Sequence, residues 1–227
     1  MTKRFVPQCK LVTGRVEVGR VLAVATLGSV RQPIEQRWNH NIHYHRLVLR
    51  VIPAGAVSAL DVGTGDGLLA RDLSRVVPDV TAIDLDRDVV RSARAEFDGI
   101  NFAVGDVMTY EFGRQFDVVA SVATLHHLDD LPAALRRLAD LTSPGGIVVV
   151  VGLARPTRWS DFAMDAVGVI QHRWLSWRHG LWEHSAPTVW PPAHSYQEIH
   201  RSAVAVLPGV AWRKLPLFRY SLIWRKP

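Results

Sequence analysis

The chain is poor in cysteine and in long apolar runs. Cys9 is the only cysteine among 227 residues, so no disulfide can form within the chain, and chemistry that needs paired thiols is excluded. The longest uncharged apolar stretch near the start, residues 21–30, is much shorter than the roughly 20 residues that cross a bilayer. Glu17 and Arg20 interrupt the region where a signal peptide would be apolar. We therefore expect no membrane span, no secretion signal and a cytoplasmic location.

The two signs of charge are unevenly distributed along the chain. Residues 1–56 carry nine Lys/Arg and two Asp/Glu, residues 57–153 carry eight and fifteen, and residues 154–227 carry ten and four. An acidic centre thus lies between two basic flanks. The centre suits a cationic ligand, whereas the flanks suit an anionic substrate, phospholipid headgroups or nucleic acid. Arginines that only keep the surface soluble explain the flanks equally well.

Short apolar runs alternate with amphipathic stretches from residue 57 onward, which is typical of βαβ units around a parallel sheet. The pattern predicts strands over residues 57–62, 80–84, 101–104, 116–120, 147–152, 210–215 and 220–224. It predicts helices over residues 68–76, 88–96 and 132–141. The fold class is therefore α/β, with a buried parallel sheet.

The chain is long enough for one domain with short appendages. We expect residues 37–227 to form that domain and residues 1–36 to be an extension, partly disordered. Within the domain, residues 154–200 are rich in Trp and Arg and predict a lid or substrate-binding insertion. Its tryptophans could stack an aromatic substrate, lie on a membrane surface, stack bases or pack against the sheet. We see no RNA-binding module beside the domain, so nucleic acid is not an expected partner.

Three glycines, two residues apart, stand where the first predicted strand ends and a helix begins, in the stretch ALDVGTGDGL at residues 59–68. Such a loop at the carboxyl end of the first strand is where ligands bind in open α/β sheets. The dinucleotide fingerprint needs a small residue at position 68, where this chain has Leu68. Asp61 and Asp66 would also place negative charge near a bound pyrophosphate. A cationic ligand without phosphate fits better.

This stretch and four later ones resemble the motifs of class I S-adenosylmethionine (SAM)-dependent methyltransferases of the small-molecule, methyltransferase-11/25-like type. The later stretches are residues 81–86, 104–107, 116–129 and 141–146, in the family's order. The resemblance covers about residues 38–153. It implies a Rossmann-like, doubly wound, mostly parallel seven-stranded sheet with helices on both faces, and SAM as the cofactor.

The resemblance also implies roles for individual residues. Asp84 would accept hydrogen bonds from both ribose hydroxyls, and Asp106 would lie beside the exocyclic amine of adenine. Each has an alternative, since Asp84 could only cap a helix and Asp106 could belong to a common Gly-Asp turn. Asp61 could bond the loop without touching ligand. The predicted cofactor-binding residues are Asp61, Gly63, Thr64, Gly65, Gly67, Asp84, Leu85, Asp106, Val107 and Ala123.

His126 and His127 are candidate general bases. Imidazole titrates near neutral pH, and in the family the loop after the fourth strand faces the transferred methyl group. Many such enzymes need only hold the nucleophile in line with the S-methyl bond, because the sulfonium is already activated. A substrate contact by one of the pair and a structural role are equally compatible with the sequence.

A second histidine cluster, His40, His43 and His45, could suggest a metal, but no cysteine or acid pattern accompanies it. We predict no metal site. A helix or lid entering the cofactor cleft explains residues 38–45 better, with Tyr44 reaching SAM.

The sequence thus predicts methyl transfer from SAM to an O, N or C nucleophile of a small, partly apolar molecule. One alternative is a SAM-binding or membrane-associated protein without catalysis. Another is an NAD(P)-dependent reductase of similar fold. Peripheral membrane contact stays open, and no feature of the sequence indicates an oligomeric state.

Overall fold

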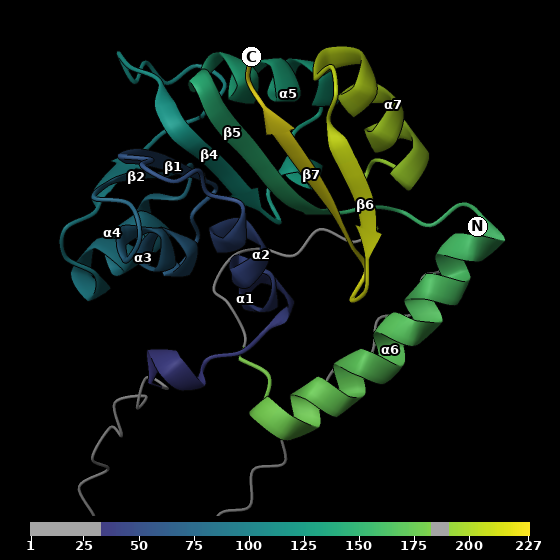
Figure 1. The fold of residues 1–227 in the computed structure, drawn as a ribbon. Helices are drawn as coiled ribbons and strands as arrows, with labels where there is room; N and C mark the ends of the chain where they lie inside the picture. The colour runs from purple at the N-terminus through teal and green to yellow at the C-terminus, as the bar shows by residue number, and fades with distance from the viewer. Residues whose placement is uncertain (1–32, 183–190) are drawn as a thin grey trace, which may run out of the picture. The chain divides into compact units, whose positions relative to one another are not determined.

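The computed structural model describes residues 33–182 and 191–227, and a seven-stranded sheet in the order β3-β2-β1-β4-β5-β7-β6 forms its centre (Figure 1). The strands are β1 (Ser58–Val62), β2 (Asp79–Asp84), β3 (Asn101–Val104), β4 (Phe116–Val122), β5 (Thr142–Leu153), β6 (Ala211–Leu215) and β7 (Arg219–Arg225). Strands β1 to β5 are parallel, whereas β7 runs antiparallel to both β5 and β6. The predicted mostly parallel, Rossmann-like sheet is confirmed.

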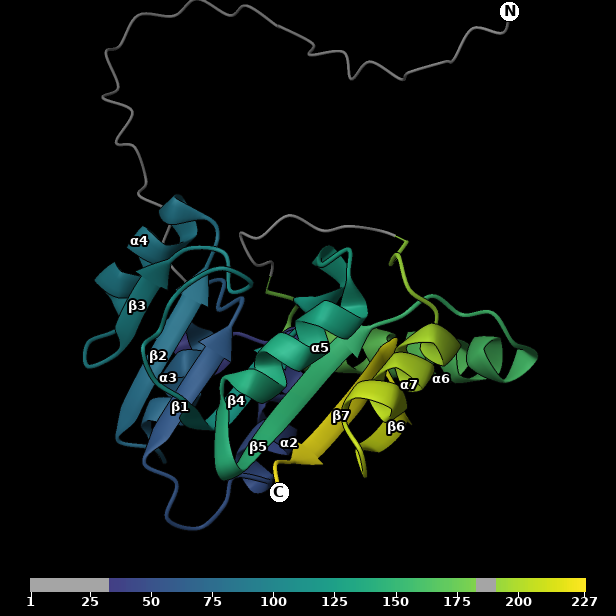
Figure 2. The same ribbon diagram turned by 90° about the horizontal axis from the view of Figure 1, so that it is seen from above.

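Helices cover both faces of the sheet (Figure 2). They are η1 (Ile34–Gln36), α1 (His40–His43), α2 (His45–Arg50), α3 (Leu68–Ser74), α4 (Arg87–Glu96), η2 (Leu125–His127), α5 (Leu131–Asp140), α6 (Trp159–His179) and α7 (Tyr196–Val206). Side chains of α2, α3 and α4 share one apolar cluster with the sheet, and those of α5 and α7 share another. Because both faces are covered, the parallel strands read as continuous apolar runs.

Local sequence explains where these elements begin and end. All five residues of β1 are buried. Asp86 caps α4, since its carboxylate accepts hydrogen bonds from the backbone N–H groups of Asp88 and Val89, and a proline lies in the first turn of α5. Residues 144–146, which end the last of the family-like stretches, lie within the bounds of β5, where the pairing with β4 shifts register. These local signals fix the carboxyl ends of the parallel strands, where the candidate site lies.

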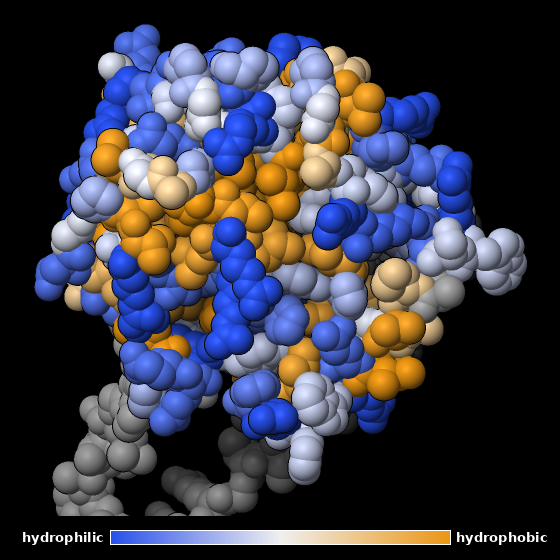
Figure 3. Space-filling view, viewed as in Figure 1, coloured by the Kyte–Doolittle hydropathy of each residue, from blue (hydrophilic) through white to orange (hydrophobic). Residues whose placement is uncertain are grey.

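Helices α6 and α7 were not predicted. The buried carboxylate of Asp161 accepts hydrogen bonds from the N–H groups of Thr157 and Arg158 at the start of α6 and pairs with Lys214 of β6. Trp159 and Trp177 of α6 are 91% and 83% exposed, and Figure 3 shows apolar side chains along this helix. Among the described residues, no helix is long and apolar enough to cross a bilayer.

The predicted domain boundaries are only partly within the described residues. Most of the extension, residues 1–32, lies outside them, as does Trp190. Residues 154–200 contain α6 and the start of α7, joined through residues that are not described. The lid or insertion role of this segment stays a prediction.

Candidate functional site

The glycine-rich loop joins β1 to α3 with three left-handed residues. Gly63, Gly65 and Gly67 have φ values of 72°, 53° and 75°. A Cβ on Gly63 would meet Oγ1 of Thr124 at 2.1 Å, so this position is closed by protein. A Cβ on Gly65 would have no neighbour within 4 Å. Gly65 therefore leaves its backbone open to a ligand, as glycine does where a ligand approaches closely.

Asp84, at the end of β2, holds this loop. Its Oδ2 accepts a hydrogen bond of 2.9 Å from the N–H of Gly65, and its Oδ1 accepts one of 3.1 Å from the N–H of Asp86. Each carboxylate oxygen can accept further hydrogen bonds, so the group can bind hydroxyls as well as the loop. The next side chain, Leu85, is 72% exposed and offers an apolar surface beside it.

Asp61 is buried beneath the loop, and its exposed fraction is 1%. It accepts a hydrogen bond of 2.7 Å from the hydroxyl of Thr64. Its pKa is raised to about 7, mainly by burial and in part by the charge of Asp84, while the Thr64 hydroxyl opposes the shift. A carboxyl group in this state can ionise when a cation is bound beside it.

The chain after β3 supplies Asp106 and Val107. Oδ1 of Asp106 accepts a hydrogen bond of 2.9 Å from the N–H of Met108, which is the turn interaction that the sequence left open. Asp106 is nevertheless exposed and lines the same cavity as Asp84, while Val107 is buried. The turn and a ligand contact are therefore compatible.

The loop after β4 brings the predicted histidines to the same edge of the sheet. Ala123 has a φ of 57°, an uncommon conformation for a residue with a Cβ. His126 is buried, and its Nδ1 has no hydrogen-bond partner among the described residues. Burial first, then the charges of His127 and Arg219, lowers the pKa of His126 to about 4, so the ring is neutral at pH 7. His127 is exposed, and partial desolvation lowers its pKa.

A cavity of about 660 Å³ joins these groups. This volume falls within the range of about 300–1,000 Å³ typical of small-molecule sites. Of the ten predicted cofactor-binding residues, only Gly67 is not among its lining residues; a Cβ on Gly67 would meet Ala93 and Phe97 instead. Both His126 and His127 line the cavity.

The cavity also contains residues that were not among the predicted cofactor-binding or catalytic residues. They are Asn39, Asn41, Ile42, His45, Asp66, Leu68, Leu69, Val62, Ile83, Asp86, Gly105, Val122, Thr124, Leu128, Leu153, Trp182 and Arg219. Many belong to the predicted motifs, but Asn41, Leu153 and Arg219 come from separate parts of the chain. For Arg219, the sequence offered one signal, because this arginine directly precedes the apolar run of the last predicted strand.

The second histidine cluster does not converge. His40 shares a hydrogen bond of 2.8 Å with His172, and His45 shares one of 2.8 Å with Asp72. No group of three potential metal ligands occurs in residues 33–182 and 191–227. The hydroxyl of Tyr44 donates to the carbonyl of Pro216 at 2.7 Å, and Tyr44 does not line the cavity, so the prediction that it reaches SAM is wrong in this structure.

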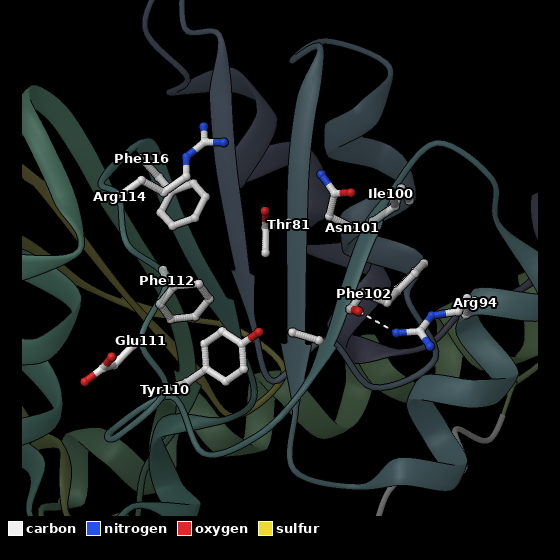
Figure 4. A pocket seen from close by; sticks show the side chains of 11 residues that line it. Thr81, Arg94, Ile100, Asn101, Phe102, Tyr110, Glu111, Phe112, Arg114 and Phe116 are labelled. Carbon is white, nitrogen blue, oxygen red and sulfur yellow. Dashed lines mark hydrogen bonds between the residues drawn. The ribbon is translucent and has the colours of Figure 1, made fainter.

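A second cavity, of about 410 Å³, lies over β2 and β3 and contains none of the predicted site residues (Figure 4). Its two arginines are already bound. Arg94 donates to the carbonyl of Phe102 at 2.5 Å, and Arg114 pairs with Asp79 at 2.5 Å. Tyr110 and Phe112 pack against each other along its wall. We therefore assign the candidate site to the larger cavity.

Comparison with known proteins points to the same family. A family model described as a methyltransferase domain matches residues 60–150. An uncharacterized methyltransferase of Mycobacterium tuberculosis is 40% identical over 201 residues, 86% of this chain and all of that relative. A ubiquinone biosynthesis O-methyltransferase of Methylobacterium nodulans is 32% identical over 131 residues, 56% of this chain and 52% of its own length.

Among solved structures, the SAM-bound amino pentose methyltransferase CalS10 of Micromonospora echinaspora, involved in calicheamicin biosynthesis, matches with a TM-score of 0.59 and 16% identity. The match covers 85% of this chain and 94% of that one and shows a shared fold. The fold, the ordered motifs and the relative matched over its whole length agree. The chain belongs to the class I SAM-dependent methyltransferases, and its cofactor is S-adenosylmethionine.

Proposed function

We propose that this protein transfers the methyl group of SAM to an O, N or C nucleophile of a small, partly apolar molecule. The observation that carries the proposal is the 660 Å³ cavity, which continues from the glycine-rich loop and Asp84 to a largely apolar region lined by Ile42, Leu153 and Trp182. One end offers the cofactor groups and the other offers room for an acceptor.

The residues present fit the cofactor. Asp84 has acceptor capacity left for the two ribose hydroxyls, and Gly65 leaves its backbone accessible. Leu85 and Val107 offer apolar surface for adenine, with Asp106 placed for its exocyclic amine. Asp61 and Thr64 lie beneath the loop, and we assign the cationic end of the cofactor to the side of the cavity nearest them. When bound, SAM supplies an activated methyl group on a sulfonium.

The protein's own contribution is orientation and exclusion of water. The apolar walls desolvate the acceptor and hold it near the donor, which is the main requirement for an in-line displacement. His126, neutral at pH 7, can accept or donate a hydrogen bond to the acceptor through its free Nδ1. His127 is the alternative contact. We propose that one of these two histidines contacts the acceptor.

Turnover tests the proposal directly. The protein is incubated with SAM and panels of phenols, amines and acids, and release of S-adenosylhomocysteine (SAH) is measured. Turnover of any acceptor supports methyl transfer. SAH binding without turnover across the panels would favour a non-catalytic SAM-binding protein, and tight NADPH binding without SAM binding would favour a reductase.

The state of Asp61 predicts a pH dependence of cofactor binding. Because its pKa in the free protein is about 7, a bound cation must displace a proton below that pH. SAM affinity is expected to rise roughly tenfold between pH 6 and pH 8. Calorimetry at both values checks this, and Asp61→Asn should flatten the profile. A wild-type affinity that is equal at the two pH values would show that Asp61 does not face the cation.

The raised pKa of Asp61 also makes the folding stability of the protein without SAM depend on pH. The pKa of Asp61 is raised from 3.8 in the unfolded chain to about 7 in the folded protein. Between these two pH values, the carboxyl group is therefore protonated in the folded state and ionised in the unfolded state. The stabilising contribution is complete below the unfolded pKa and is lost as pH rises through about 7. Bound SAM should offset this loss.

We also predict peripheral membrane contact through α6. Trp159, Ile170 and Trp177 are 91%, 71% and 83% exposed, with Arg173 and Arg178 on the same helix. The protein should co-float with anionic phosphatidylglycerol vesicles at low salt. A Trp159→Ser and Trp177→Ser double variant should co-float less, whereas Val204→Ser on α7 should not change. Absence of co-flotation by the wild type removes the membrane contact.

A further inference from the structure

A buried arginine lies in the cavity outside the predicted cofactor residues. Arg219 begins β7 and pairs in register with Leu153 of β5, at the carboxyl edge of the parallel strands. Its exposed fraction is 6%. Its Nη2 donates a hydrogen bond of 2.7 Å to Oδ1 of Asn41, while its Nε is buried with no partner among the described residues.

The positive charge of Arg219 is not neutralised. Within residues 33–182 and 191–227, no carboxylate forms an ion pair with it, although eight other pairs are formed there. Burial lowers its pKa to about 10, which still leaves it charged at pH 7. The same charge contributes to the lowered pKa values of His40 and His126. A buried, unpaired cation is costly to folding, so a site that retains one has a use for it.

The strand order places Arg219 in the acceptor part of the cavity. Asp84 ends β2, and β7 lies four strands farther along the sheet, past β1, β4 and β5. Neighbouring strands are about 4.8 Å apart, so the two strands are separated by roughly 19 Å. Its neighbours Leu153, Asn41 and His126 are uncharged at pH 7: Leu153 is its register partner, Asn41 accepts its hydrogen bond, and its charge acts on His126.

We propose that Arg219 binds a carboxylate of the methyl acceptor, so that the acceptor is an acid with an apolar body. A guanidinium presents parallel N–H donors that match the two oxygens of a carboxylate. Asn41 holds one side of the guanidinium and leaves Nε free. The inference depends on the proposed function, because the acceptor is defined by methyl transfer. SAM itself carries a carboxylate on its methionine portion, and this group is the second candidate to bind Arg219.

The experiment measures dissociation constants on SAH-saturated protein by calorimetry and ligand-observed NMR. The probes are matched acids and amides, namely benzoate with benzamide and hexanoate with hexanamide. Wild type is expected to bind each acid at least ~10-fold more tightly than its amide, as a charge-assisted, bidentate contact requires. In Arg219→Gln and Arg219→Met the preference should disappear, and Arg219→Lys should retain part of it. Arg213→Gln, an exposed arginine on β6, is the matched control and should keep the full preference.

A second arm separates the two carboxylates. SAH and 5′-methylthioadenosine, which lacks the amino-acid end, are titrated into wild type and Arg219→Gln. We expect both affinities to be unchanged. If only SAH binds more weakly to the variant, Arg219 binds the donor and the proposal is wrong.

Stability separates a binding role from a structural one. Removing an unpaired buried charge should not lower the melting temperature of Arg219→Met in the free protein. A large drop in melting temperature, together with equal acid and amide affinities in wild type, would overturn the inference while leaving SAH binding, and hence the proposed function, intact. Failure of wild type to bind SAH would overturn both.

Discussion

Replacing Asp84 with alanine is expected to weaken SAH binding by about 100-fold or more. Hydrogen bonds to a charged group contribute about 1.5–3 kcal/mol each, and under the proposed ribose assignment the variant loses two of them. It also releases the N–H of Gly65, which the carboxylate holds at 2.9 Å, and so loosens the loop. Calorimetric titration with SAH measures the effect. Asp84→Asn, which keeps one acceptor oxygen, should fall between wild type and alanine.

Asp130→Ala is the matched control for this prediction. Like Asp84, Asp130 accepts backbone hydrogen bonds in a loop: it caps α5, because its carboxylate accepts a hydrogen bond of 2.9 Å from the N–H of Ala133, but it does not line the cavity. Its loss should cost about 1 kcal/mol of stability and leave SAH affinity unchanged. Wild-type affinity in Asp84→Ala would show that Asp84 only caps its turn and that the ribose assignment is wrong.

Gly63→Ala is expected to destabilise the folded protein by about 2–5 kcal/mol. The left-handed conformation costs a residue with a Cβ about 1–2 kcal/mol, and overpacking adds about 1–3 kcal/mol. The overpacking arises because the new Cβ would lie 2.1 Å from Oγ1 of Thr124, whose hydroxyl donates to the carbonyl of Val62. Urea unfolding without ligand measures the loss as a lower midpoint at constant slope.

Substitutions at two other glycines separate the conformational cost of Gly63→Ala from its steric cost. Gly99 has a φ of 74° and open space around a Cβ, so Gly99→Ala should cost only the conformational part. Gly65→Ala should cost a similar amount in stability, since its Cβ also meets no protein atom, but it should weaken SAH binding. Equal stability losses at Gly63 and Gly99 would contradict the steric argument, and normal SAH binding by Gly65→Ala would place the ligand elsewhere.

The sheet and its cofactor side were predictable because their signals are local. Every predicted strand overlaps an observed one, and the three predicted helices correspond to α3, α4 and α5. The carboxyl ends of parallel strands meet at one edge, so Asp84 and Asp106 could be placed beside the glycine-rich loop from chain order alone. Helix α6 was missed because its segment lacks a clear apolar period and exposes its tryptophans. Helix α7 does carry local signals, a capping box of Ser195 and Glu198 and buried apolar residues at helical spacing, and these were overlooked.

By itself, the sequence determined the fold class, the glycine-rich loop and most of the residues around the larger cavity, because strand ends, glycines and helix caps act over a few residues. Tertiary structure alone decided the part of the cavity that we assign to the acceptor. It brought Asn41, Leu153 and Arg219 together from distant parts of the chain, and it moved Tyr44 away to Pro216. It also set the pKa values of Asp61 and His126, because desolvation depends on everything packed around a group rather than on its neighbours in sequence.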